Sequence, residues 1–231
     1  MTANGTLSDD DIRALLPTHP DGPGCTIAVM RGGDLVQSFH HGFASVEHRV
    51  PIGPRTVFRI ASVTKQFLCA GVVALAEEGR LDLDDPLVAH LPEMHPVPGA
   101  ATLRQAMANT SGIRDHLELW YLSGGGLQVP HRLPDSLALA MRQSETNFPP
   151  GERHLYSNAN FLLLSEVLRR VSGEPPESFL ERRFFQPLGM TRTRLRAGHH
   201  DVIADLATGY LATAEGGLSR GRMTAEIWGE G

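Results

Sequence analysis

The sequence of 231 residues contains a single lysine, Lys65, and arginine supplies its other permanently basic side chains. Because arginine provides the positive surface charge, a lone lysine is not needed for solubility. A guanidinium stays protonated in proteins, whereas a partly buried lysine amine can lose its proton. The composition therefore singles out Lys65 as a candidate base or proton shuttle.

Net positive charge, cysteine and long apolar runs are scarce as well. The formal net charge is −5, which argues against nucleic acid as a partner. Two cysteines, Cys25 and Cys69, are too few for a disulfide framework. The apolar run from Phe67 to Ala76 is too short to cross a membrane. Residues 1–13 lack the basic and apolar regions of a secretory signal, so we expect no membrane partner and a cytoplasmic location.

The eleven histidines do not form a metal-binding pattern. The adjacent pairs His40-His41 and His199-His200 would point to opposite faces of a strand or helix, and no His-Glu-x-x-His sequence is present. We therefore expect neither a metal nor a cofactor. His116 and His154 are interpreted as solvated loop residues.

The pair Ser62 and Lys65 opens the apolar run, which Gly79 closes. The run predicts a helix that is apolar on nearly every face and is therefore buried, with Gly79 at its C-terminal cap. A spacing of three residues places the ammonium beside the hydroxyl, and the helix dipole favours an alkoxide at Ser62. From this stretch alone, a surface serine with a solvated lysine is an equal alternative.

A second cluster contains Tyr156 and Asn158, after a rigid Pro149-Pro150-Gly151 turn and before a helix predicted at residues 159–171. One interpretation makes Asn158 a helix N-cap and Tyr156 a packed ring. The other places the phenol and the amide on a rigid loop that faces Ser62. An ammonium beside a phenol favours its ionised form, which can then accept the serine proton.

The coarse pattern predicts an antiparallel hairpin of Cys25–Met30 and Leu35–Phe43, a short strand at Val57–Ile60, and only helices between residues 80 and 200. We expect three segments. Residues 1–79 form the first part of an α/β lobe with the serine helix, residues 80–200 form a mostly helical lobe, and residues 201–231 return to the α/β lobe.

Taken together, the motifs resemble the serine β-lactamase and penicillin-binding-protein family in its class C-like branch. Ser62-Val63-Thr64-Lys65 matches the Ser-x-x-Lys signature of that superfamily, and Tyr156-Ser157-Asn158 matches its Tyr-x-Asn motif. The linking segments at residues 79–86, 109–113 and 185–190 are also similar to the family's, and they occur in its order. Gln66, Cys69 and Arg114-Asp115 resemble the D-aminopeptidase branch.

The resemblance implies a β-lactamase/transpeptidase-like α/β fold, in which helices flank an antiparallel sheet and an all-α lobe is inserted. It also implies a serine hydrolase that acts through an acyl-enzyme on a small-molecule or short peptide amide or ester. Ser62 would be the nucleophile, Lys65 and Tyr156 would share its proton, and Asn158 would bind substrate or orient Lys65. A carboxylesterase, a β-lactamase and a catalytically inactive binding module remain alternatives.

One departure from the family concerns its third motif, Lys-Thr-Gly or His-x-Gly, which no residue after Tyr156 supplies. His40-His41-Gly42 has similar letters but precedes the nucleophile, so we interpret it as unrelated. We therefore expect a truncated chain without the C-terminal strands, the final helix, the substrate clamp and the second oxyanion donor. An exposed sheet edge would then favour self-association.

Overall fold

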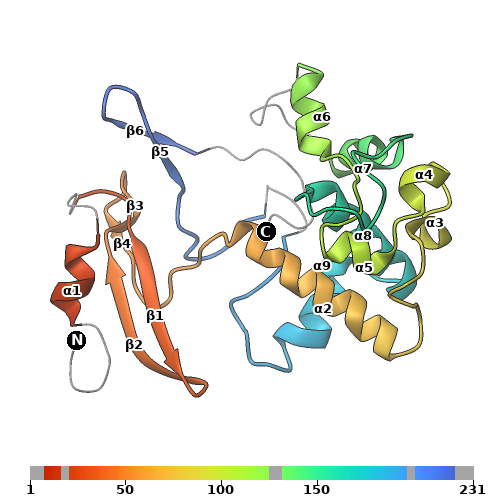
Figure 1. Cartoon of the computed structure of the whole chain (residues 1–231). Coiled ribbons are helices and arrows are strands. Elements are labelled where there is room, and N and C mark those ends of the chain that lie inside the picture. Colours follow the sequence, from red (N-terminus) through yellow and green to blue (C-terminus); the bar gives the residue numbers. More distant parts are fainter. Residues whose placement is uncertain (1–7, 17–20, 125–131, 197–200, 222–231) are drawn as a thin grey trace. The chain divides into compact units, whose positions relative to one another are not determined.

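The computed structural model describes residues 8–16, 21–124, 132–196 and 201–221 (Figure 1). By packing, the chain forms two compact units. Among the described residues, the N-terminal unit comprises residues 8–16, 21–59 and 202–221, and the helical unit comprises residues 60–124, 132–196 and 201. The serine helix thus packs with the helical unit, whereas our predicted first segment ran to residue 79. The three-segment division stays a prediction.

The N-terminal unit contains the predicted hairpin. Strands β1 (Cys25–Arg31) and β2 (Asp34–His41) pair antiparallel, with Ile27 opposite Phe39. Gly32 and Gly33 form the turn with φ angles of 59° and 92°, a conformation that glycine adopts without steric cost. The hairpin prediction is confirmed.

Short elements complete the N-terminal unit. Helix α1 (Asp9–Ala14) begins with a capping box between Ser8 and Asp11, and strand β3 (Phe43–Ser45) pairs antiparallel with β4 (Val50–Pro51). Strands β5 (Tyr210–Ala212) and β6 (Leu218–Arg220) form a second antiparallel hairpin. Among the described residues of this unit, the buried apolar side chains are those of Ile12, Phe39, Ala44 and Ile52.

The predicted strand at Val57–Ile60 is wrong. Only Val57 pairs, in a single parallel bridge to Leu206, through hydrogen bonds of 2.9 Å to the Asp205 carbonyl and 2.8 Å from the Ala207 N–H. The backbone then leaves the extended region, since Ile60 has φ −100° and ψ 3°. A strand cannot continue through this dihedral change.

The helical unit is built on two long helices that pack against each other, α2 (Thr64–Glu77) and α8 (Asn158–Ser172). Leu68, Val72 and Leu75 of α2 are fully buried. A side chain at Gly71 would come within 3.1 Å of Leu168, so this glycine allows the two helices to approach closely. The prediction of a buried serine helix is therefore confirmed.

Both long helices end at glycines in the left-handed conformation. Gly79, with φ 69°, follows α2. Arg80 N–H donates to the Leu75 carbonyl and Gly79 N–H donates to the Ala76 carbonyl, and this pair of hydrogen bonds is a Schellman motif. Gly173, with φ 80°, caps α8. The predicted ends of both helices agree with the structure to within two residues.

Short helices surround this pair. They are α3 (Leu87–His90), α4 (Pro96–Gly99), α5 (Leu103–Met107), α6 (His116–Leu122), α7 (Leu133–Met141) and α9 (Pro176–Leu180), the last followed by the π-helical turn η2 (Glu181–Phe185). Over the described residues between 80 and 196, the only β pairing is an isolated bridge between Pro86 and Thr102. The structure therefore has the helical lobe that the sequence predicted.

A buried carboxylate ties α8 to its surroundings. Glu166 accepts hydrogen bonds of 2.7 and 2.8 Å from Arg169 and of 2.7 Å from Arg170. Burial raises the pKa of Glu166, but these guanidinium hydrogen bonds outweigh burial and hold the pKa below its usual value. Arg170 also pairs with Glu93, at 2.9 Å, which anchors α8 to the chain that follows α3.

Candidate active site

Ser62 and Lys65 lie where a short 3₁₀ turn, η1 (Ala61–Val63), leads into α2. Ala61 has φ 46°, a left-handed conformation that is rare for a residue with a Cβ. Ser62 is exposed, whereas Lys65 is 6% exposed. The Lys65 Nζ donates a 3.0 Å hydrogen bond to Ser62 Oγ. The chain thus holds an accessible hydroxyl above a buried amine.

Tyr156 completes this cluster from a distant part of the sequence. Its phenolic oxygen lies 2.8 Å from Ser62 Oγ, across a separation of 94 residues. The Lys65 Nζ lies 5.2 Å from the centroid of the Tyr156 ring and 5.3 Å from that of Phe161, within the range of cation–π contact. The structure therefore brings together three of the four residues that the sequence singled out.

Asn158 is held by a different partner from those expected. It is the first residue of α8, after the N-cap Ser157, so the N-cap interpretation of Asn158 is wrong. Its backbone N–H and its Nδ2 both donate to Asp115 Oδ2, at 2.9 and 2.8 Å. Its Oδ1 is buried and has no hydrogen-bond partner among the described residues. The sequence prediction was an amide directed at Lys65 or at substrate.

Asp115 therefore supports two helix starts at once. Its Oδ2 accepts the first N–H of α8, and its Oδ1 accepts a 2.8 Å hydrogen bond from Leu117 N–H in the first turn of α6. At 7% exposure the carboxylate is buried, and two helix N-termini supply the donors and partial positive charge that such a group needs. Sequence reasoning linked Asp115 only to a branch of the family.

The whole segment 109–115 lies along the loop that leads to Tyr156. Gly151 N–H donates to the Thr110 carbonyl at 2.7 Å, and Asn147 N–H donates to the Gly112 carbonyl at 2.8 Å. Gly112 has φ 73°, and a Cβ there would lie 2.2 Å from the Phe148 carbonyl oxygen. This close backbone contact explains the glycine. In the sequence, residues 109–113 were marked only by their similarity to a linking segment of the family.

Other reactive groups of the described chain contribute little here. Burial raises the pKa of the Cys69 thiol to about 11, so Cys69 stays protonated near neutral pH. Among the described residues, no group of three His, Cys, Asp or Glu side chains could hold a metal ion. The pair His199-His200 lies outside the described residues.

The expectation of solvated histidines is half right. His154 is exposed, but His116 is 1% exposed, with its Nδ1 3.8 Å from Asp115 Oδ1. Its place as the first residue of α6, directly after the buried Asp115, carries the ring into the interior. The prediction for His116 is therefore wrong.

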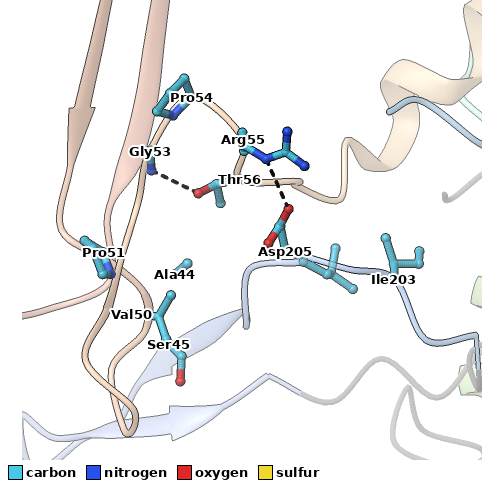
Figure 2. Close-up of a pocket in the computed structure, with 11 residues that line it drawn as sticks. Ala44, Ser45, Val50, Pro51, Gly53, Pro54, Arg55, Thr56, Ile203 and Asp205 are labelled. Carbon is cyan, nitrogen blue, oxygen red and sulfur yellow. Dashed lines mark hydrogen bonds and ion pairs between the residues drawn. The ribbon is translucent and has the colours of Figure 1, made fainter. Parts of the chain in front are cut away.

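A separate pocket of about 460 Å³ lies within the N-terminal unit. Figure 2 shows its main polar groups, Arg55 paired with Asp205 at 3.9 Å and Thr56 accepting a 3.0 Å hydrogen bond from Gly53 N–H. Among the described residues that line it, none is histidine, cysteine or lysine. The Ser62 cluster is therefore the better candidate for chemistry.

The geometry of that cluster fits nucleophilic catalysis. A serine hydroxyl becomes a useful nucleophile when a neighbouring group accepts its proton. Ser62 Oγ has two such neighbours within hydrogen-bonding distance, an amine at 3.0 Å and a phenol at 2.8 Å. This arrangement could support attack by Ser62 Oγ on a carbonyl carbon.

Comparison with known proteins identifies the family. The model of the family described as Beta-lactamase matches residues 12–229, and the chain therefore belongs to the beta-lactamase family. The chain is 32% identical over 204 residues to a D-aminopeptidase of Gluconobacter oxydans, an alignment that covers 88% of this chain and 38% of that protein. The chain therefore spans well under half the length of this relative.

Two solved structures are similar in fold. The octameric penicillin-binding protein homologue from Pyrococcus abyssi superposes with a TM-score of 0.78 at 30% identity, over 90% of this chain and 48% of that one. The D-amino acid amidase from Ochrobactrum anthropi SV3, in complex with D-phenylalanine, superposes with a TM-score of 0.70 at 25% identity, over 90% and 55%. The predicted β-lactamase/transpeptidase-like fold is confirmed. Within the described part of the chain, no helix is long and apolar enough to cross a membrane.

Proposed function

We propose that the protein is a serine hydrolase that cleaves amide bonds through an acyl-enzyme on Ser62. The observation that carries the proposal is the Ser62 hydroxyl held between the buried Lys65 amine and the Tyr156 phenol, at 3.0 and 2.8 Å. The proposal needs no metal or cofactor.

In the first step Ser62 Oγ forms a bond to the carbonyl carbon of the substrate, and its proton passes to the Tyr156–Lys65 pair. The carbonyl oxygen becomes an oxyanion, which the Ser62 backbone N–H stabilises as one hydrogen-bond donor. The C–N bond then breaks, and the same pair returns the proton to the leaving amine. The product of this step is an ester of Ser62.

In the second step water attacks that ester. The Tyr156–Lys65 pair accepts a proton from water, and it donates a proton to Ser62 Oγ as the C–O bond breaks. The carboxylic acid product is released, and the serine, phenol and amine return to their starting state. The Lys65 amine lies 3.0 Å from Ser62 Oγ and beside the Tyr156 ring, where it can share the transferred proton in both steps.

For the substrate we propose amides or short peptides of D-amino acids. The support is the similarity to proteins named as a D-aminopeptidase and a D-amino acid amidase. The local resemblance at Gln66, Cys69 and Arg114-Asp115 points to the same branch. A carboxylesterase or β-lactamase with the same nucleophile is the second candidate, because the Ser62 cluster by itself does not select between ester, lactam and peptide carbonyls.

Covalent labelling tests the nucleophile. We expect a fluorophosphonate to attach one label per molecule of the full-length protein, at Ser62, as measured by mass spectrometry. The Ser62→Ala variant should remain unlabelled. Lys65→Arg should abolish or nearly abolish labelling although it keeps the positive charge, because a guanidinium cannot exchange the proton. If Lys65→Arg labels as fast as the parent, Lys65 has no role in proton transfer. If Ser62 carries no label, the inactive binding module is the better interpretation.

A further inference from the structure

Resting on the proposed function, we propose that Asn109 is the positioning residue for Tyr156. One asparagine holds the chain on both sides of the tyrosine. The Asn109 backbone carbonyl accepts a 2.9 Å hydrogen bond from Leu155 N–H, and the Asn109 Oδ1 accepts one of 3.2 Å from Ser157 N–H. Tyr156 is the residue between these two anchored positions.

These two hydrogen bonds depend on an unusual backbone conformation at Asn109. Its φ is 56°, a left-handed conformation in which asparagine is several-fold enriched among residues with a Cβ. In that conformation Asn109 follows the end of α5, with its own N–H bonded to the Ala106 carbonyl at 3.1 Å. Backbone carbonyl and side-chain oxygen can then both bond to the Tyr156 loop.

A buried amide network fixes the orientation of the Asn109 side chain. Asn160 is fully buried and donates a 3.1 Å hydrogen bond from Nδ2 to Asn109 Oδ1. Asn160 Oδ1 in turn accepts a 2.6 Å hydrogen bond from Ser111 Oγ. Because a donor on α8 approaches Asn109 Oδ1, the amide oxygen rather than the amide nitrogen faces the loop. Asn109 therefore links the loop to the helix that follows it.

Tyr156 has reason to depend on this support. Its side chain is 46% exposed, so close packing does not hold it in place as it would hold a buried ring. The phenol nevertheless has to lie within hydrogen-bonding distance of Ser62 Oγ, where it is found at 2.8 Å. A displacement of about 1 Å at a reacting group can cost about a hundredfold in rate. The two backbone hydrogen bonds are thus suited to keep the Tyr156 phenol within hydrogen-bonding distance of Ser62 Oγ.

The test compares a variant that removes the side-chain acceptor with one that keeps it. Asn109→Gly removes the side-chain oxygen and adopts φ 56° without backbone strain, although Asn160 Nδ2 then loses its acceptor. Asn109→Asp keeps an oxygen in the same place. The maximal labelling rate with a fluorophosphonate and the half-saturating concentration are measured for the full-length parent and both variants, with circular dichroism as the check of folding.

We expect Asn109→Gly to lower the maximal labelling rate about ten- to a hundredfold, with little change in the half-saturating concentration. Asn109→Asp should recover most of the rate. Because Asn109 acts by positioning the phenol, Asn109→Gly should not lower the maximal labelling rate further when Tyr156 is already replaced by Phe. A general structural defect would not produce this non-additivity.

The outcomes separate the two proposals. If the parent labels and Asn109→Gly labels equally fast, the positioning role is wrong and the proposed function stands. The positioning role is also wrong if Asn109→Gly and Tyr156→Phe lower the rate independently, or if Asn109→Asp is as slow as Asn109→Gly. A parent without label at Ser62 refutes the proposed function, and the positioning role with it.

Discussion

Ala61, which directly precedes the proposed nucleophile Ser62, has a backbone conformation that is rare for a residue with a Cβ. Its φ of 46° brings the Cβ close to a carbonyl oxygen, at a cost of about 1–2 kcal/mol. Such strain concentrates at functional sites, where the surrounding structure compensates for it. Here it directly precedes the exposed Ser62, at the turn where the chain stops being extended and begins the helix.

Glycine at this position should therefore stabilise the protein. We expect Ala61→Gly to raise the free energy of unfolding by about 0.5–1 kcal/mol, as strain relief outweighs the greater entropy of the unfolded glycine chain. Ala70→Gly, the same change inside α2, is the control and should lower it by about 1 kcal/mol. Denaturant midpoints measure both. A lower midpoint for Ala61→Gly would show that its backbone is not strained.

The residues of the site differed in how far the sequence revealed them. Ser62 and Lys65 are three residues apart on one helix, so local geometry alone brings them together, and the single lysine marks the pair. Tyr156 followed from its motif. Asn109 and Asp115 were missed as supports, because their hydrogen bonds to Ser157 and Asn158 span 48 and 43 residues. No local pattern encodes such a contact.

Among the elements, the loop of residues 109–115 packs so closely against the segment before Tyr156 that it leaves no room for a larger side chain at Gly112. Gly112 combines φ 73° with a backbone neighbour, so a methyl group there would meet the Phe148 carbonyl at 2.2 Å. Gly79 has a similar φ, 69°, but open space around its Cβ position. The two glycines therefore separate the cost of the dihedral angle from the cost of a steric clash.

We expect Gly79→Ala to lower the free energy of unfolding by about 1–2 kcal/mol, from the dihedral angle alone. Gly112→Ala should lower it by about 3 kcal/mol or more, since a clash with rigid backbone adds to the same cost. Gly112→Ala should also slow labelling of Ser62, whereas Gly79→Ala should label at the parent rate. Equal losses of stability would show that the two loops do not lie against each other as closely as the structure has them.

The sequence predicted most helices and strands. The prediction failed for a segment whose structure depends on pairing with a distant part of the chain and not on a local periodic pattern. The hairpin and the two long helices follow from alternation, apolar runs and glycine caps. The false strand at Val57–Ile60 has a β-like composition, but its neighbours in space come from residues 205–207, and only Val57 pairs with them. Composition gave no sign of how few residues would pair.

At the scale of the whole molecule, the chain has the fold of the beta-lactamase family and the Ser62 cluster within its helical unit. It spans 38% of a D-aminopeptidase and 55% of a D-amino acid amidase. The reaction and the substrate are therefore proposals for the protein as a whole. They rest on two distances at Ser62 Oγ, 3.0 Å from the Lys65 amine and 2.8 Å from the Tyr156 phenol, which suit the activation of a serine nucleophile.

The most direct test of this account is a comparison of mirror-image amides. The full-length protein and its Ser62→Ala variant are assayed for release of p-nitroaniline from D-alanine p-nitroanilide and from the L-form. The account predicts that kcat/KM is about tenfold or more higher for the D-form, a difference of about 1.4 kcal/mol in transition-state binding, and that Ser62→Ala abolishes both activities. Equal rates for the two forms, or turnover of short-chain esters alone, would contradict it.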